Sequence, residues 1–198
     1  MSGDHHFGRV HEVPTRTDVA ALTAELGRPP RGLHAVAYRC RHDVPAVVQT
    51  APRLPDGSPF PTLYYLCCST LNSTVGRMES EGLMARMTDR IAAEPVLAAA
   101  YLAAHEAYLA ERNALGDLGI TVTAGGMPTR VKCLHVLVAH ALAAGPGVNP
   151  LGDEAIALLP RYSRGMPCVP ATAGFAAVDL AAASGSGAFS RDAAGAAG

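Results

Sequence analysis

The spacing of apolar residues changes at about residue 69, and this change most constrains the fold. Before it, short apolar runs alternate with stretches rich in proline and glycine, such as 53–61. After it, apolar residues recur three and four positions apart, which is typical of helices. The order predicts an α+β fold, in which a small antiparallel sheet from the N-terminal half is packed by several helices.

Three runs in the first half predict this sheet. Residues 33–40 and 46–50 have the pattern of two strands joined as a hairpin. The apolar and aromatic run 62–68 is the best candidate for a central strand. A short helix over 18–26, with Thr17 as its N-cap, is predicted to precede them.

The second half is predicted to be mainly helical, with one further strand at 119–123. Proline suits the first turn of a helix, so Pro95 and Pro128 mark two helix starts. The predicted helices cover residues 69–82, 83–93, a long segment from Pro95, Pro128 to about Ala143, and 153–159.

The length of 198 residues and the composition, 49% hydrophobic and 17% charged, fit one folded domain. We place this domain at 17–160, after a flexible N-terminus at 1–16. The Ala/Gly-rich segment 161–198 is predicted to be a disordered tail.

Charge and hydropathy exclude several classes of protein. The net charge of −1 gives no overall attraction to nucleic acid or to an anionic membrane, and sparse aromatics also disfavour nucleic acid. No apolar run reaches the roughly 18 residues of a membrane span, so no membrane insertion is expected. The N-terminus lacks a signal-peptide pattern, which favours a cytoplasmic location.

The glycine-led segment from Gly125 to His135 carries the densest group of candidate functional residues. Gly125 and Gly126 precede a predicted helix start, where unpaired N–H groups attract anions. Arg130 and Lys132 add positive charge, so the segment is a candidate site for a small anionic or phosphorylated ligand. The alternative is an ordinary loop with two solvated cations.

The same segment and the helix predicted to continue from it carry a thiol, Cys133, and two imidazoles, His135 and His140. On one helix, Cys133 and His140 would be separated by about 10.5 Å along the axis, too far to share a zinc ion. Cys133 and His135 would point about 200° apart, so they could share a metal only if the helix started late. Cys133 near a helix start is also a candidate nucleophile, with His135 as its base.

A metal site could instead be assembled from several elements. Cys40, Cys68, Cys133 and His135 form the candidate ligand set, which suits zinc, or an iron–sulfur cluster less conventionally. The odd number of cysteines, five, argues against a disulfide scaffold. The alternative is that each cysteine is a small buried hydrophobe.

Two further features have both a structural and a functional interpretation. Tyr101, His105, Tyr108 and Arg112 form one stripe on the long helix, which lines a pocket or, more commonly, belongs to the core. Asn149, in a turn after the basic segment, binds either a ligand or the local backbone.

Several of these strings resemble a bacterial, mainly actinobacterial, family of uncharacterised proteins, the domain-of-unknown-function family 501. The resemblance rests on Pro-Phe-Pro-Thr-Leu-Tyr at 59–64, Lys-Cys-Leu-His at 132–135 and Gly-Val-Asn-Pro at 147–150, and on Glu79 and Gly82. It extends from about residue 22 to 159. Where the family usually has Thr-Cys-Pro or Thr-His-Pro, this chain has Cys-Cys-Ser at 67–69, and a position that accepts Cys or His implies a ligand role for Cys68.

The resemblance implies a cytoplasmic bacterial setting but no reaction. Family members tend to be encoded near a septum-formation initiator protein, and some carry a septum-formation label by that association. Two hypotheses follow. The first is a zinc or thiol centre that binds a small anionic ligand, and the second is a non-catalytic binding module for a cell-division protein.

Overall fold

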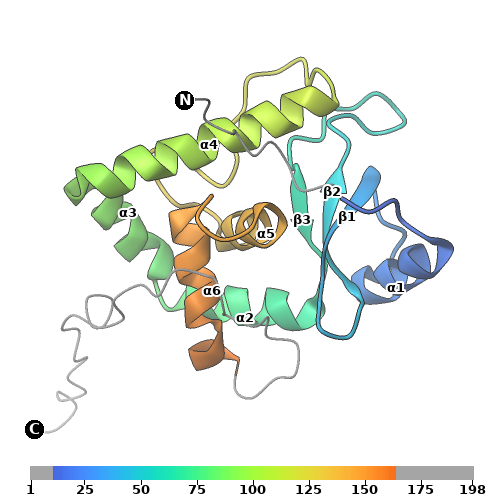
Figure 1. The fold of residues 1–198 in the computed structure, drawn as a ribbon, viewed down its shortest axis with the longest axis horizontal. Coiled ribbons are helices and arrows are strands. Elements are labelled where there is room, and N and C mark those ends of the chain that lie inside the picture. The colour runs from blue at the N-terminus through green and yellow to red at the C-terminus, as the bar shows by residue number, and fades with distance from the viewer. Residues whose placement is uncertain (1–10, 164–198) are drawn as a thin grey trace, which may run out of the picture.

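The computed structural model describes residues 11–163 and confirms the α+β class (Figure 1). The elements in chain order are α1 (Arg16–Leu26), β1 (Leu33–Arg39), β2 (Pro45–Thr50), β3 (Tyr64–Leu66), α2 (Ser69–Ser80), α3 (Leu83–Ala93), α4 (Pro95–Leu115), α5 (Leu134–Ala144) and α6 (Pro150–Tyr162). The predicted flexible segments at 1–16 and 161–198 lie mainly outside the described residues and stay predictions.

The sheet is antiparallel, with the order β1–β2–β3, so β2 is the central strand. All six residues of β2 are buried. Val48 packs with α1 on one face of the sheet, while Val47 belongs to the main core on the other. The prediction that 62–68 forms the central strand is therefore wrong, because β3 is a three-residue edge strand that pairs only with β2.

A buried ion pair attaches α1 to the sheet. Thr15, two residues before the predicted cap, begins α1 with a capping box that it shares with Asp18. The Arg39 guanidinium of β1 donates to both carboxylate oxygens of Asp18, at 2.7 and 3.0 Å. Because this paired charge favours the ionised acid, the pKa of Asp18 lies well below its usual value.

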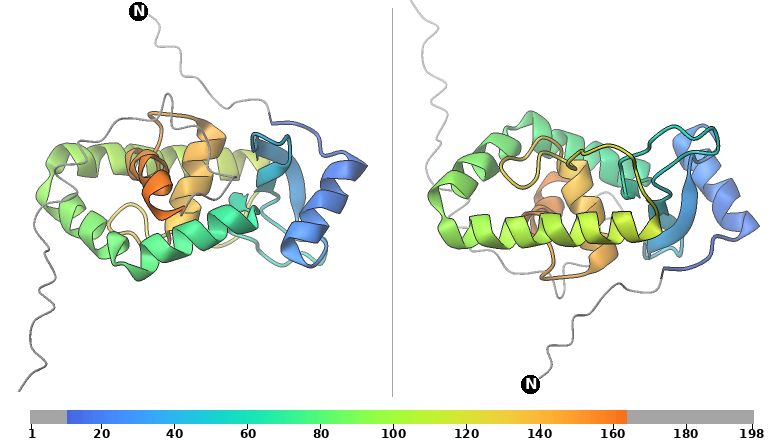
Figure 2. Two further views of the ribbon diagram at one scale, coloured as in Figure 1. Left: turned by 90° about the horizontal axis from the view of Figure 1, so that it is seen from below. Right: turned by 90° about the horizontal axis from the view of Figure 1, so that it is seen from above.

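Helix α5 is the centre of the fold. Figures 1 and 2 show it between the sheet and α6, with α2 and α4 on its other sides. Residues 137–143 are all buried. A helix that is apolar on every side has to be covered on every side, and the surrounding elements provide this cover.

Two predictions for the segment before α5 are wrong. The helix begins at Leu134 instead of Pro128, because the preceding loop closes on itself: the backbone N–H of Lys132 donates to the Gly125 carbonyl at 2.7 Å. Residues 119–123 form no strand, since Gly119 has a left-handed φ of 72° and the segment pairs with no strand of the sheet.

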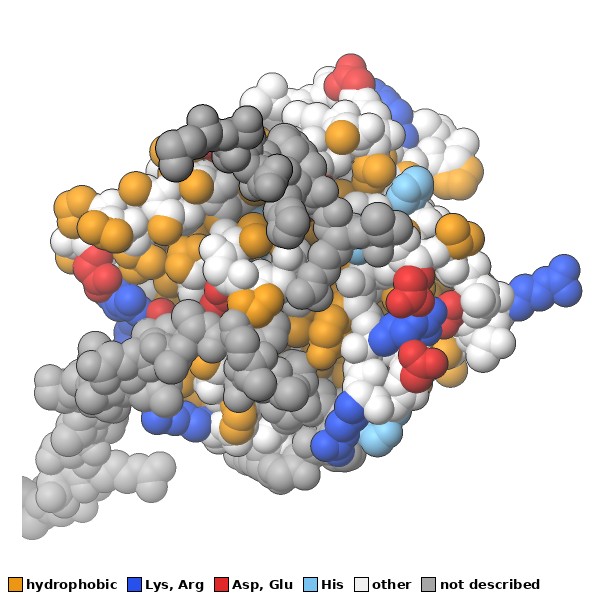
Figure 3. Space-filling model, in the orientation of Figure 1, with side chains coloured by type: hydrophobic (Ala, Val, Ile, Leu, Met, Phe, Trp, Pro, Cys, Tyr) orange, Lys and Arg blue, Asp and Glu red, His pale blue; other side chains and the backbone are white. Residues whose placement is uncertain are grey.

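None of the helices described between residues 11 and 163 combines the length and apolar character needed to span a bilayer. On the face shown in Figure 3, lysine and arginine side chains are scattered, and several lie beside acidic side chains. This face therefore carries no continuous basic surface.

The close packing of α6 on α5 generates a stability prediction. A Cβ atom on Gly152 would clash with the Leu137 carbonyl oxygen and lie 2.7 Å from the Ala141 Cβ, so Gly152→Ala should lower the free energy of unfolding by about 1–3 kcal/mol. Gly76→Ala, in open space on α2, is the matched control and should raise it by about 0.5–1 kcal/mol. Urea unfolding measures both, and equal effects would contradict the close approach.

Candidate metal centre

Three metal-ligating side chains meet where α2 ends and α5 begins. Glu79, Cys133 and His135 each offer one ligand atom, and these atoms all lie within 4.8 Å of one another. Within residues 11–163 this is the one group of three or more such residues. All three are half-buried, so the group is accessible from solvent.

The late start of α5 brings Cys133 and His135 together. Cys133 is the N-cap residue, with an extended backbone at φ −153° and ψ 112°, and His135 lies in the first turn. The 200° divergence expected on a regular helix therefore does not apply. The sequence allowed Cys133 and His135 to share a metal only if the helix started late. Helix α5 does start late, at Leu134.

Hydrogen bonds hold Glu79 and His135 in place. Oε1 of Glu79 accepts from the backbone N–H of Leu134 at 2.7 Å and lies 3.1 Å from Nδ1 of His135. The other ring nitrogen, Nε2, lies 3.3 Å from the carbonyl oxygen of Asn72. Because a carbonyl oxygen can only accept, Nε2 carries a proton and Nδ1 is the nitrogen that faces the group.

The surroundings of His135 favour its protonated form. The hydrogen bond with Cys133 and the negative charge of Glu79 raise the pKa of His135 to about 9, although partial burial opposes the shift. In the metal-free protein at neutral pH, Nδ1 therefore carries a second proton, which it donates to Glu79. A bound metal would replace this proton.

The residues predicted to bind an anion lie in the loop before α5, and not at the start of a basic helix. Gly125 and Gly126 have left-handed φ values of 59° and 92° and shape a loop, and the exposed Arg130 and Lys132 precede the helix. The first N–H group of α5, that of Leu134, donates to the carboxylate of Glu79 in the same chain. The glycines position the helix start, and no anion of another molecule is needed to satisfy it.

The remaining predicted ligands lie elsewhere. Cys40 is half-buried and packs against the core from the β1–β2 turn, and Cys68 is a buried core residue just before α2. Neither joins the group of Glu79, Cys133 and His135.

Asn149 and His140 are both buried and contact each other. Asn149 is the fully buried N-cap of α6, where its oxygen accepts from Gly152 N at 2.9 Å and its amide contacts Nδ1 of His140 at 3.2 Å. The His140 ring stacks on Tyr64, with centroids 5.9 Å apart. Both polar groups of the Asn149 side chain are thus engaged inside the protein.

Glu79 was not among the residues predicted to bind a metal. It is separated by 54 positions from Cys133 and is brought to it only by the packing of α2 against α5. The available signal was indirect, since Glu79 belongs to the residues that carry the family resemblance.

Comparison with known families supports that resemblance. The model of the family "Protein of unknown function (DUF501)" matches residues 36–157, more than half of the chain. The chain belongs to this family. Searches of curated proteins and of solved structures gave no match.

Buried His140 generates a prediction for the pH dependence of stability. Burial lowers its pKa to about 4, so between about pH 6.5 and 4 the unfolded chain binds a proton that the folded protein does not. Wild-type stability should fall as the pH drops through this window, by up to about 3 kcal/mol from this group. In His140→Gln this contribution should be absent. Urea unfolding from pH 7 to 4 measures the two slopes, and parallel slopes would contradict the assignment.

Proposed function

We propose that the protein binds zinc through Glu79, Cys133 and His135 and leaves a fourth position open for water or a small anionic ligand. The observation that carries this proposal is the convergence of the three ligand atoms within 4.8 Å. Sulfur, imidazole nitrogen and carboxylate oxygen are the ligands of zinc in proteins, and three protein ligands with one open position are typical of catalytic zinc sites.

The contacts around the ligands support this proposal. A histidine that binds a metal usually donates its other ring N–H to a carbonyl or carboxylate, which fixes the orientation of the ring. The contact of His135 Nε2 with the Asn72 carbonyl provides this, and the Leu134 N–H holds the Glu79 carboxylate in the same way. Both orienting groups belong to the backbone, so they persist through most substitutions.

The protonation of His135 sets the expected pH dependence of binding. Since its pKa is about 9 without metal, zinc has to displace a proton from Nδ1 at neutral pH. Apparent affinity should therefore rise with pH up to about 9.

The hydrogen bond between Cys133 and His135 favours a second candidate, a metal-free nucleophilic thiol. A thiolate next to a protonated imidazole and at a helix start is more reactive than a free one. Glu79 would then orient His135, as the third member of such a group does. The two candidates differ in whether a metal chelator changes the thermal stability of the protein.

Metal analysis of purified protein tests the zinc proposal. We expect about one zinc per chain by mass spectrometry, and a sulfur-to-metal charge-transfer band after replacement of zinc by Co²⁺. Zinc binding should weaken in each of the variants Cys133→Ser, His135→Gln and Glu79→Gln. For the substitutions at Cys133 and His135, the affinity should fall by roughly 100-fold or more. The charge-transfer band should vanish in Cys133→Ser.

Cys40→Ser is the matched control, because Cys40 is a half-buried thiol outside the group. It should retain both the zinc and the band. A protein without zinc, whose thermal stability is unchanged by chelators, would overturn the proposal. Rapid alkylation of Cys133 in that protein would then support the nucleophilic thiol, and slow alkylation the non-catalytic binding module.

A further inference from the structure

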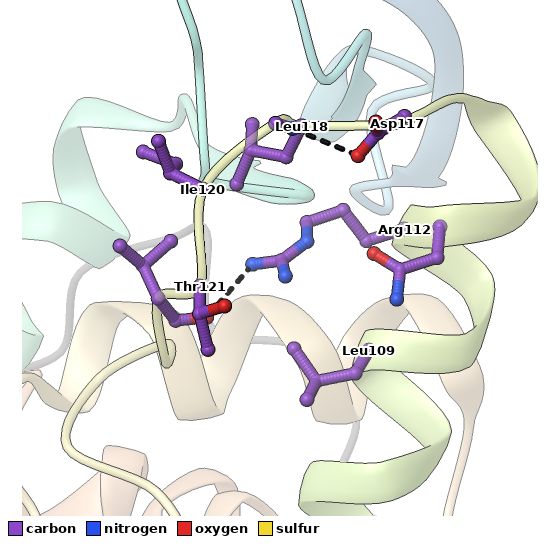
Figure 4. A pocket seen from close by; sticks show the side chains of 9 residues that line it. Leu109, Arg112, Asp117, Leu118, Ile120 and Thr121 are labelled. Carbon is purple, nitrogen blue, oxygen red and sulfur yellow. Dashed lines mark hydrogen bonds between the residues drawn. The ribbon is translucent and has the colours of Figure 1, made fainter.

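A second candidate site, which shares no residue with the metal ligands, lies at the C-terminal end of α4. An open pocket of about 630 Å³ is lined by the last turns of α4 and the loop 117–122. Figure 4 shows the Arg112 side chain extending from α4 between this loop and Leu109. The loop passes over the guanidinium and does not pair with the sheet, which is why the strand prediction for this segment is wrong.

Arg112 is a buried cation without an acidic partner. Its side chain does not extend to solvent as expected for the end of an amphipathic stripe, since the residue is only 4% exposed. Its one hydrogen bond within the described chain is the contact of Nη1 with the Val122 carbonyl at 3.3 Å, and Nε is buried without a partner. No described carboxylate lies within ion-pair distance of it.

The acidic residue in the pocket wall does not supply the missing charge. Asp117 is exposed, and its carboxylate accepts from the backbone N–H of Gly119 at 2.8 Å. Figure 4 shows this hydrogen bond within the loop, and Asp117 forms no ion pair with Arg112. Because a buried charge is costly unless it is paired, the pocket is incomplete without a negative group.

Apolar side chains form much of the remaining wall. Leu109 and Leu118 flank the guanidinium, and Ile120 at the rim is 48% exposed. A guanidinium with free donors matches the geometry of an oxyanion. The apolar wall matches a hydrocarbon body attached to that group.

We propose that this pocket binds a small organic anion, whose carboxylate or phosphate group contacts Arg112 and whose apolar body lies against Leu109 and Leu118. The loop that would cover the ligand is held in place from outside. The Arg53 guanidinium donates to the carbonyl oxygens of Asp117 and Leu118, at 3.0 and 3.1 Å. This site is independent of the zinc proposal, because it shares no residue with it.

Calorimetry and protein NMR with matched probes test the proposal. Benzoate and phenyl phosphate present a carboxylate and a phosphate on the same ring, and benzamide is the neutral control. We expect saturable binding of at least one anion, with NMR shifts centred on Ile120 and Thr121, and binding at least about tenfold weaker for benzamide. The stronger of the two anions identifies the headgroup. Acetate and inorganic phosphate, which lack the ring, should bind more weakly.

Two variants and a control separate this site from non-specific effects. Arg112→Gln should weaken anion binding at least about tenfold. Ile120→Trp should also weaken it, by filling the rim without touching Arg112, so the test holds even if Arg112→Gln does not fold. Arg161→Gln removes an exposed positive charge at the C-terminal end of α6, outside both proposed sites, and should leave binding unchanged. Undiminished binding in Ile120→Trp or in a folded Arg112→Gln, or no binding by the wild type, would overturn the proposal.

His105 gives an independent readout, about two turns before Arg112 on the same face of α4. Burial and the charge of Arg112 lower the pKa of His105, while Glu106 raises it. An anion on Arg112 would offset part of that positive charge, so the His105 pKa should rise when benzoate or phenyl phosphate is bound. An unchanged His105 titration at saturating ligand would place the anion elsewhere and overturn the assignment.

Discussion

The burial of α5 over residues 137–143 is the constraint on which the rest of the structure depends. A helix that is apolar on all sides cannot lie on a surface, so the sheet, α2, α4 and α6 have to surround it. Gly152 permits the closest of these contacts, because its missing Cβ leaves room for the backbone of α5. One face of the sheet covers one side of this helix, and the other face packs against α1.

The start of α5 also determines where the candidate metal centre forms. The helix begins at Leu134, after the loop that closes between Gly125 and Lys132, and this leaves Cys133 extended and His135 in the first turn. The N–H group of Leu134, a fully buried residue, has no partner within the helix. Glu79 from α2 accepts that N–H and also contacts His135, so one carboxylate completes the helix start and the ligand group.

The spacing of apolar residues and the position of Pro95 correctly predicted the elements that depend on neighbouring residues in the sequence. The hairpin and helices α2, α3 and α4 follow from apolar spacing and from Pro95, and their predicted positions agree with the structure to within a few residues. The errors concern nonlocal effects. Pro128 suits a helix start by itself, but the loop from Gly125 to Lys132 closes through its own hydrogen bonds. The contribution of Glu79 to the site depends on packing between segments about fifty residues apart, which no local pattern contains.

A comparison with other buried charged side chains shows how Arg112 differs from them. Arg39 bonds both oxygens of the buried Asp18, and Arg90 bonds the buried Glu154 at 2.6 Å. Asp18 and Glu154 are thus paired with arginine, whereas the buried Asp153 has no cationic partner within residues 11–163 and accepts from the backbone N–H of Gly147. Arg112 is as deeply buried as these acids but contacts a single carbonyl at 3.3 Å, beside an open pocket. A buried guanidinium beside an open pocket, without a carboxylate within ion-pair distance among the described residues, is expected where the partner comes from another molecule.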